Sequence, residues 1–136
     1  MEERIARELW RWAFADGLER AKIVGHGSDF LTMLEFYLGG LLCQSPAARK
    51  RGWWCDGVLA VEITRRRRHS FRLAGRAYLT ATEVGPFEME LYFARRRATA
   101  PTRVVLRCGP SGGGERLRPP RDDEWTIAVE FTPEDG

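Results

Sequence analysis

The chain has 136 residues, of which 43% are hydrophobic and 30% are charged, and its formal net charge is +3. This length suits one domain with its own core, and this composition argues against a disordered chain. The longest strongly apolar stretch, Phe36 to Cys43, is too short to span a membrane, and the acidic start Met1-Glu2-Glu3 is unlike a secretion signal. We therefore expect a single cytoplasmic domain over residues 1–136.

The amino-terminal part, residues 1–45, is expected to be helical. Apolar residues recur at three- and four-residue steps between Glu2 and Ala15, which predicts an amphipathic helix that stops near Gly17. The stretch Leu18 to Val24 fits either a continued helix or a short strand, and we favour the helix.

A second helix is expected to begin at Ser28 or Asp29, whose side chains suit the first-turn amides, and to end at Pro46. Its apolar stripe is wide enough to cover a sheet. The pair Gly39-Gly40 lowers its intrinsic stability, which predicts tight packing or a bend there. Residues 46–57 are expected to form a polar connector.

From residue 58 to residue 132 the apolar period changes to two, which predicts strands. Five are expected: Val58 to Thr64, Phe71 to Thr82, Phe87 to Ala94, Thr102 to Cys108 and Trp125 to Phe131, with a mobile loop over 109–124. Leu59, Val61 and Ile63 are assigned to the face that packs on the helices. The expected fold is α+β, with two N-terminal helices packed on one face of a five-stranded, mainly antiparallel meander sheet.

The opposite face of this sheet is expected to be charged but balanced. Strand by strand, its residues are acidic, basic, acidic, basic and acidic: Glu62, then Arg72 and Arg76, then Glu88 and Glu90, then Arg103 and Arg107, then Glu130. Opposite charges on neighbouring strands stabilise each other. This pattern is typical of a solvated sheet face and not of a surface that holds a polyanion.

Two arginine runs fall in turns of the expected sheet. The first comprises Arg65, Arg66, Arg67 and Arg68 with His69, and the second comprises Arg95, Arg96 and Arg97. In a meander alternate turns lie at the same edge, so the two runs are expected to meet there. Neither run contains an acidic residue, so the cluster either binds an anionic partner or simply extends into water and protects the sheet edge.

The adjacent residues Trp53 and Trp54 form a second candidate. In an extended segment neighbouring side chains point to opposite faces, so one ring should be buried and the other more exposed. An exposed tryptophan beside Arg49, Lys50 and Arg51 has the composition of a protein-interface hot spot.

The sequence contains no recognisable nucleophile, phosphate-binding or dinucleotide motif. Its three cysteines form no CxxC pair and only two histidines accompany them, so we expect reduced thiols, no metal and no cofactor. Helices over a curved antiparallel sheet resemble the cystatin and NTF2-like layouts between Asp29 and Phe131. That resemblance implies an apolar pocket, lined by Trp10, Trp12, Tyr37, Trp53, Trp54 and Trp125.

The expected function is a non-enzymatic binding module that recognises a protein, or another acidic macromolecule, through the arginine-rich edge. An adaptor, inhibitor or immunity role would all fit, and homo-oligomerisation stays open. The first alternative is nucleic-acid binding, and the second is a small-molecule or enzymatic pocket in a cystatin- or NTF2-like fold.

Overall fold

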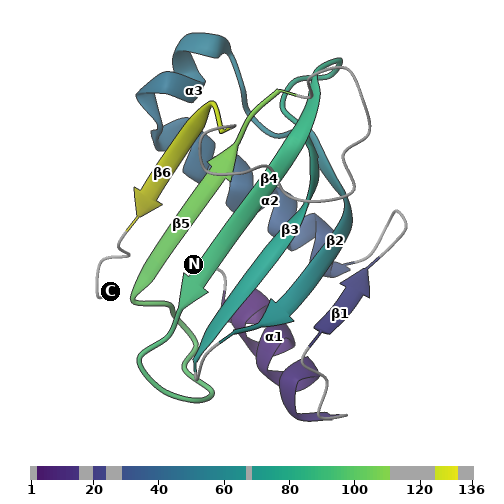
Figure 1. The fold of residues 1–136 in the computed structure, drawn as a ribbon, viewed down its shortest axis with the longest axis vertical. Coiled ribbons are helices and arrows are strands. Elements are labelled where there is room, and N and C mark those ends of the chain that lie inside the picture. Colours follow the sequence, from purple (N-terminus) through teal and green to yellow (C-terminus); the bar gives the residue numbers. More distant parts are fainter. Residues whose placement is uncertain (1–2, 16–19, 24–28, 67–68, 111–124, 132–136) are drawn as a thin grey trace.

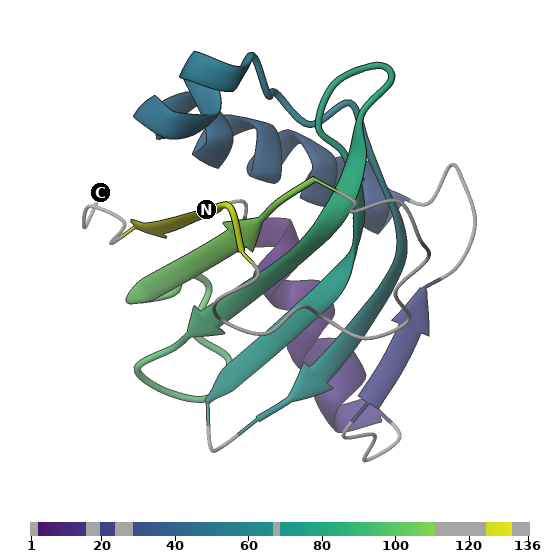
Figure 2. The same ribbon diagram turned by 45° about the horizontal axis from the view of Figure 1, so that its top comes forward.

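The computed structural model of the protein describes residues 3–15, 20–23, 29–66, 69–110 and 125–131. They form an α+β fold with two layers, in which the helices cover one face of an antiparallel sheet (Figures 1 and 2). Both long helices precede the main strands of the sheet in the chain. The fold class expected from the sequence is confirmed.

The described residues contain three helices: α1 (Glu3–Ala15), α2 (Asp29–Gln44) and α3 (Pro46–Arg51). The third occupies the first half of the expected connector, residues 46–57. Pro46 ends α2 but also begins α3, because the N–H that proline lacks would have no partner in a first turn. The Ser45 hydroxyl accepts a hydrogen bond from the Ala48 amide at 3.3 Å, and Gly52 ends the helix with a left-handed φ of 71°.

The sheet has six strands: β1 (Arg20–Ile23), β2 (Gly57–Arg65), β3 (Ser70–Tyr78), β4 (Val84–Tyr92), β5 (Arg103–Cys108) and β6 (Ile127–Phe131). They pair antiparallel in chain order, which makes the sheet a meander. Strands β2 to β6 are the five expected ones. Strand β1 corrects the helix favoured for Leu18 to Val24, because Arg20–Ile23 pairs with β2 and Lys22 lies opposite Glu62. The periodicity of residues 18–24 alone could not predict this pairing with a strand that lies far along the chain.

A β-bulge in β2 corrects the expected inner face. The register shifts between Leu59 and Glu62, and Ala60 adopts a left-handed φ of 49°. An extra residue reverses the alternation of the strand on one side of the bulge. Val58 is therefore buried and Leu59 is only partly buried, so the assignment of Leu59 to the inner face is wrong.

The core lies between the sheet and the two long helices. Its largest fully buried side chains come from both layers: Ile5, Leu9, Leu34, Leu38, Val61, Leu73, Leu79, Phe87, Met89, Leu91, Val104 and Leu106. Helix α1 lies across the ends of the central strands and α2 lies along the rest of the sheet (Figure 2). This packing places α1 next to the turns that carry the arginines.

Candidate functional site at the arginine-rich end of the sheet

The two turns that carry the arginine runs lie side by side. The amide of Phe93, at the start of the second turn, donates a hydrogen bond to the carbonyl of His69 at 2.8 Å. The first turn is closed by the Arg66 amide, which donates to the Ser70 carbonyl at 2.9 Å. Both turns lie at the lower end of the sheet in Figure 1. The expected meeting of the two runs is confirmed for the described arginines; Arg67 and Arg68 lie outside the described residues.

Helix α1 holds the second turn in place. The indole N–H of Trp10 donates to the carbonyl of Ala98 at 2.8 Å, and the Trp10 ring packs edge-on against Phe71 and Phe93 with centroid separations of 4.9 and 5.3 Å. Aromatic pairs of this kind contribute about 0.5–1.5 kcal/mol each beyond the area they bury, so they hold α1 against the strand ends that flank the turn. The turn that contains Arg95, Arg96 and Arg97 is therefore held in place by contacts with α1.

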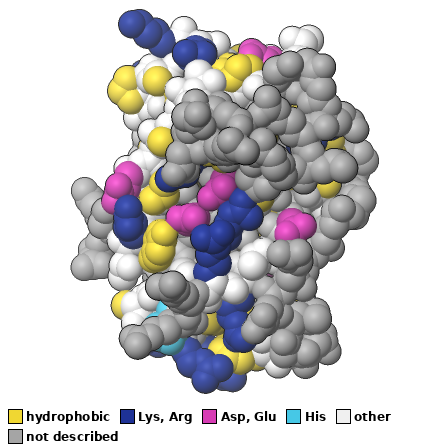
Figure 3. Space-filling model, viewed as in Figure 1, with side chains coloured by type: hydrophobic (Ala, Val, Ile, Leu, Met, Phe, Trp, Pro, Cys, Tyr) yellow, Lys and Arg dark blue, Asp and Glu magenta, His cyan; other side chains and the backbone are white. Residues whose placement is uncertain are grey.

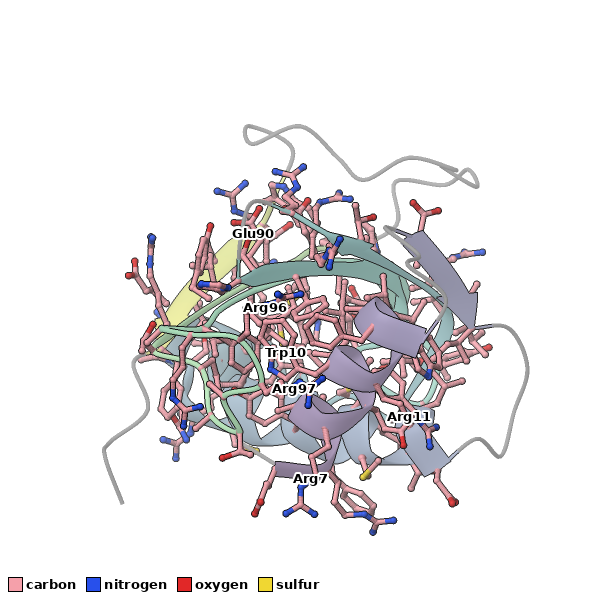
Figure 4. The ribbon with its side chains drawn as sticks, turned by 90° about the horizontal axis from the view of Figure 1, so that it is seen from below. Arg7, Trp10, Arg11, Glu90, Arg96 and Arg97 are labelled. Atoms are coloured by element: carbon pink, nitrogen blue, oxygen red, sulfur yellow. The ribbon has the colours of Figure 1, made fainter. Side chains whose placement is uncertain are left out.

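Two of these arginines share one aromatic ring. The guanidinium carbons of Arg96 and Arg97 lie 4.4 and 5.1 Å from the centre of the Phe14 ring of α1. Consecutive side chains of an extended segment point to opposite sides, but Arg97 has a left-handed φ of 63°, which breaks that alternation. Figure 4 looks onto this end and shows Arg96 and Arg97 beside α1 and near Trp10.

The positive charges here have little internal compensation. Within the described part of the chain, Arg65, Arg95, Arg96 and Arg97 form no ion pair with a carboxylate. Arg66 has one long ion pair, in which its guanidinium lies 3.9 Å from the Glu90 carboxylate. The nearest arginines of α1 are already paired within that helix, Arg7 with Glu3 and Arg11 with Glu8.

Glu90 supplies the negative charge nearest to Arg66. The sequence pattern assigned Glu90 to the open face of the sheet but did not predict this ion pair. Glu90 also accepts a hydrogen bond from the Tyr92 hydroxyl at 2.6 Å, and this bond raises the pKa of that hydroxyl. The contact of Phe14 with Arg96 and Arg97 was not predicted either. In the sequence, only its position one helical turn after Trp10 suggests that Phe14 lies on the same side of the helix.

The open face of the sheet is balanced, as predicted. Arg72 pairs with Glu88 at 2.9 Å, and Arg103 pairs with Glu130 at 2.7 Å. Figure 3 shows basic and acidic side chains interspersed across this face. On the described part of this face Arg72 and Arg103 are thus neutralised, whereas Arg95, Arg96 and Arg97 of the second turn have no ion pair among the described residues.

His69 lies at the inner side of the same end. Its ring stands edge-on to Trp10 with centroids 6.5 Å apart, and its Nδ1 is buried with no hydrogen-bond partner among the described residues. The histidine ring thus packs toward α1.

The tryptophan pair lies at the other end of β2. The Trp54 amide donates a hydrogen bond to the Leu79 carbonyl at 2.9 Å, next to the turn between β3 and β4. Trp53 is buried, with its indole N–H 3.3 Å from the Glu83 carboxylate, while Trp54 is 50% exposed. The predicted division between the two rings is confirmed. Trp53 is nevertheless a core residue, and the tryptophans and the arginines form separate surfaces.

The two buried thiols are not activated as nucleophiles. Burial raises the pKa of Cys55 to about 11 and that of Cys108 to about 12, so both are protonated near neutral pH. Over the described ranges, no three His, Cys, Asp or Glu side chains are grouped so that they could hold a metal ion. No described helix is both long enough and apolar enough to cross a membrane.

Comparisons of the chain with protein-family models, with curated proteins and with solved structures returned no match. The resemblance to the cystatin and NTF2-like layouts therefore stays a prediction, and the site rests on the geometry of its own residues.

Proposed function

We propose that this protein is a non-enzymatic binding module that recognises an acidic segment of a partner protein through the arginine end. We define the arginine end by the described residues of the two turns: Arg65, Arg66, His69, Arg95, Arg96 and Arg97. The observation that carries this proposal is the pair of guanidinium groups, Arg96 and Arg97, held on the ring of Phe14. Stacking limits the rotamers of both side chains, so they lose less conformational entropy when they bind a ligand.

Carboxylates fit this arrangement well. A guanidinium presents a planar fork of donors that pairs bidentately with a carboxylate, and stacking on an aromatic ring leaves the edge of the fork available. Charge-assisted hydrogen bonds of this type contribute about 1.5–3 kcal/mol each. A short acidic segment can therefore be held by the few arginines that lie on two adjacent turns.

A long polyanion fits less well. A nucleic acid that left the arginine end and crossed the sheet would meet Glu90 and Glu130 on the open face, where two ion pairs already neutralise Arg72 and Arg103. Phosphate binding gains most of its free energy from many released counterions, which requires an extended basic surface. The compact patch therefore favours a protein ligand over a nucleic acid.

The test compares two probes, a short fluorescent oligoglutamate peptide and a fluorescent DNA duplex, by anisotropy over a range of salt concentrations. We expect the peptide to bind, and the double variant Arg96→Ala/Arg97→Ala to weaken it about tenfold or more. The variant Arg49→Ala/Lys50→Ala removes the same charge from exposed positions of α3 at the other end of the sheet, and serves as the matched control.

Tighter binding of the duplex, with a steep loss of affinity in salt, would favour the nucleic-acid alternative. Equal loss of peptide affinity in the test and control variants would show that net charge alone is recognised. That result would reject the arginine end as a specific site.

A further inference from the structure

The arginine end is divided between the two faces of the sheet. Arg96 and Arg97 lie on the ring of Phe14, which belongs to α1 and therefore to the layer that covers the inner face. Arg66, from the neighbouring turn, instead reaches Glu90 on the open face. Figure 4 shows Glu90 away from α1 and Arg97 beside it. In the free protein the Arg66 side chain is therefore directed away from the other two cations.

Glu90 is the fixed partner of this ion pair. The Tyr92 hydroxyl donates to Glu90 Oε2 at 2.6 Å, a charge-assisted hydrogen bond of the strong kind. The Tyr92 ring is held as well, because the guanidinium carbon of Arg103 lies 5.2 Å from its centre and Arg103 is bound to Glu130 at 2.7 Å. Arg66 has only its contact with Glu90 Oε1. Of the two partners, Arg66 is the one that can move.

The ion pair between Arg66 and Glu90 is also a weak one. The guanidinium and the carboxylate are 3.9 Å apart, which is beyond hydrogen-bonding distance, and the Arg66 side chain is 56% exposed. Exposed pairs of this kind change an equilibrium by about fivefold at most. Arg72, directly opposite Glu90 in the sheet, is bonded to Glu88 at 2.9 Å and leaves this carboxylate to Arg66. A ligand carboxylate that hydrogen-bonds Arg66 therefore displaces Glu90.

We propose that Glu90 is an internal competitor of the acidic ligand: it occupies Arg66 in the free protein and releases it when a ligand carboxylate reaches the arginine end. This inference rests on the proposed function and adds a means of regulating the same site. The two turns are joined by the hydrogen bond from the Phe93 amide to the His69 carbonyl at 2.8 Å, so a ligand on Arg96 and Arg97 lies next to the turn of Arg66. Glu90 lowers the affinity for any acidic segment that engages Arg66.

The first test is a double-mutant cycle, with the oligoglutamate peptide as the probe and anisotropy as the measurement. We expect Glu90→Gln to bind the peptide about twofold to fivefold more tightly, and Arg66→Ala to abolish that gain in the double variant. Glutamine keeps an oxygen that can accept from the Tyr92 hydroxyl. Asp56→Asn is the matched control, because it removes one negative charge from an exposed position at the other end of β2.

A gain that persists in the Arg66→Ala background would show that Glu90 merely repels the ligand, and an equal gain in Asp56→Asn would show that only net charge matters. Either result would overturn the role of Glu90. The proposed function is tested separately by Arg96→Ala/Arg97→Ala. If that variant weakens binding while Glu90→Gln changes nothing, only the inference about Glu90 is wrong. If neither the wild type nor Glu90→Gln binds the peptide, both proposals are wrong.

The second test follows the Arg66 side chain directly by nuclear magnetic resonance. Its Nε–H signal is assigned by its absence from the spectrum of Arg66→Ala. We expect this signal to shift in Glu90→Gln without peptide, and to shift in the wild type when the peptide is added. An Arg66 signal that stays in place while those of Arg96 and Arg97 shift would show that the ligand leaves the ion pair with Glu90 intact, which contradicts the proposal.

Discussion

The guanidinium carbon of Arg96 lies 4.4 Å from the centre of the Phe14 ring, although the two residues are far apart in the sequence. Arg97 approaches the same ring at 5.1 Å. One aromatic residue of α1 therefore orders two cations of a turn that belongs to the sheet. The turn itself is held to α1 by the hydrogen bond that the Trp10 indole N–H donates to the Ala98 carbonyl. The arginine end is consequently a composite of the first helix, the turn between β2 and β3, and the turn between β4 and β5.

The contribution of Phe14 can be measured by Phe14→Leu. Leucine keeps apolar packing on α1 but removes the ring face, so each guanidinium loses a cation–π interaction of about 0.5–1 kcal/mol. We expect the affinity for the oligoglutamate peptide to fall about threefold to tenfold, because the two arginines are no longer ordered before binding, and the melting temperature to fall by a few degrees. An unchanged affinity, measured by anisotropy, would show that the ring does not organise the arginines.

The buried thiols and the Tyr37 hydroxyl predict a loss of stability at high pH. Burial raises the pKa of Cys55 from 9.0 to about 11, that of Cys108 from 9.0 to about 12, and that of Tyr37 from 10.0 to about 12. Between the ordinary and the raised pKa the folded state holds protons that the unfolded state has lost. The stabilisation is thus present below pH 9 and disappears as pH rises through 11 to 12.

Urea unfolding at a series of pH values tests this. The free energy of unfolding should fall as pH rises above 9, and Cys108→Ala should make that fall shallower. A curve that stays flat to pH 11 contradicts the assignment. Exposed Cys43 provides a control, because iodoacetamide at pH 8 should modify it alone in the native protein and all three cysteines in denaturant.

The neighbouring glycines of α2 should respond in opposite ways to alanine. A Cβ atom at Gly40 meets nothing within 4 Å, so Gly40→Ala gains helix propensity and should stabilise the protein by about 0.5–1 kcal/mol. At Gly39 the added atom would lie 3.1 Å from the Trp54 carbonyl oxygen, in a segment held by the bond between Trp54 and Leu79. Gly39→Ala should therefore lower stability.

Urea denaturation of the wild type and both variants measures the two changes in the free energy of unfolding. If Gly39→Ala proves as stabilising as Gly40→Ala, the close approach of Trp54 to α2 is wrong.

The parts of the fold that follow from local pattern were predictable, and the parts that depend on distant pairing were not. The alternation of β3 to β6 and the apolar stripe of α2 identify those elements directly. Strand β1 exists only because β2 offers it an edge, and the bulge in β2 is imposed by pairing with β3. For the site, meander topology alone brought the two arginine turns together, but the ring beneath Arg96 required knowing where α1 crosses the sheet.

The bulge itself supplies the last prediction, because both of its strands favour glycine over alanine at this point. Ala60 carries a left-handed φ of 49°, which costs an alanine about 1 kcal/mol, so Ala60→Gly should stabilise the protein by up to that amount. Opposite the bulge, a Cβ atom at Gly75 would lie 2.9 Å from the Leu59 carbonyl oxygen and 3.2 Å from the Phe87 ring. Gly75→Ala should therefore destabilise the protein by about 1–3 kcal/mol.

Combining the two substitutions shows whether they report on one structural feature. The residues lie on paired strands and share the Leu59 carbonyl region, so their effects on the free energy of unfolding should not add. Urea denaturation of the wild type, both single variants and the double variant measures this coupling. A β2 strand that paired regularly would bury Leu59 in place of Val58, and Ala60→Gly would then lower stability, as glycine does in the middle of a strand.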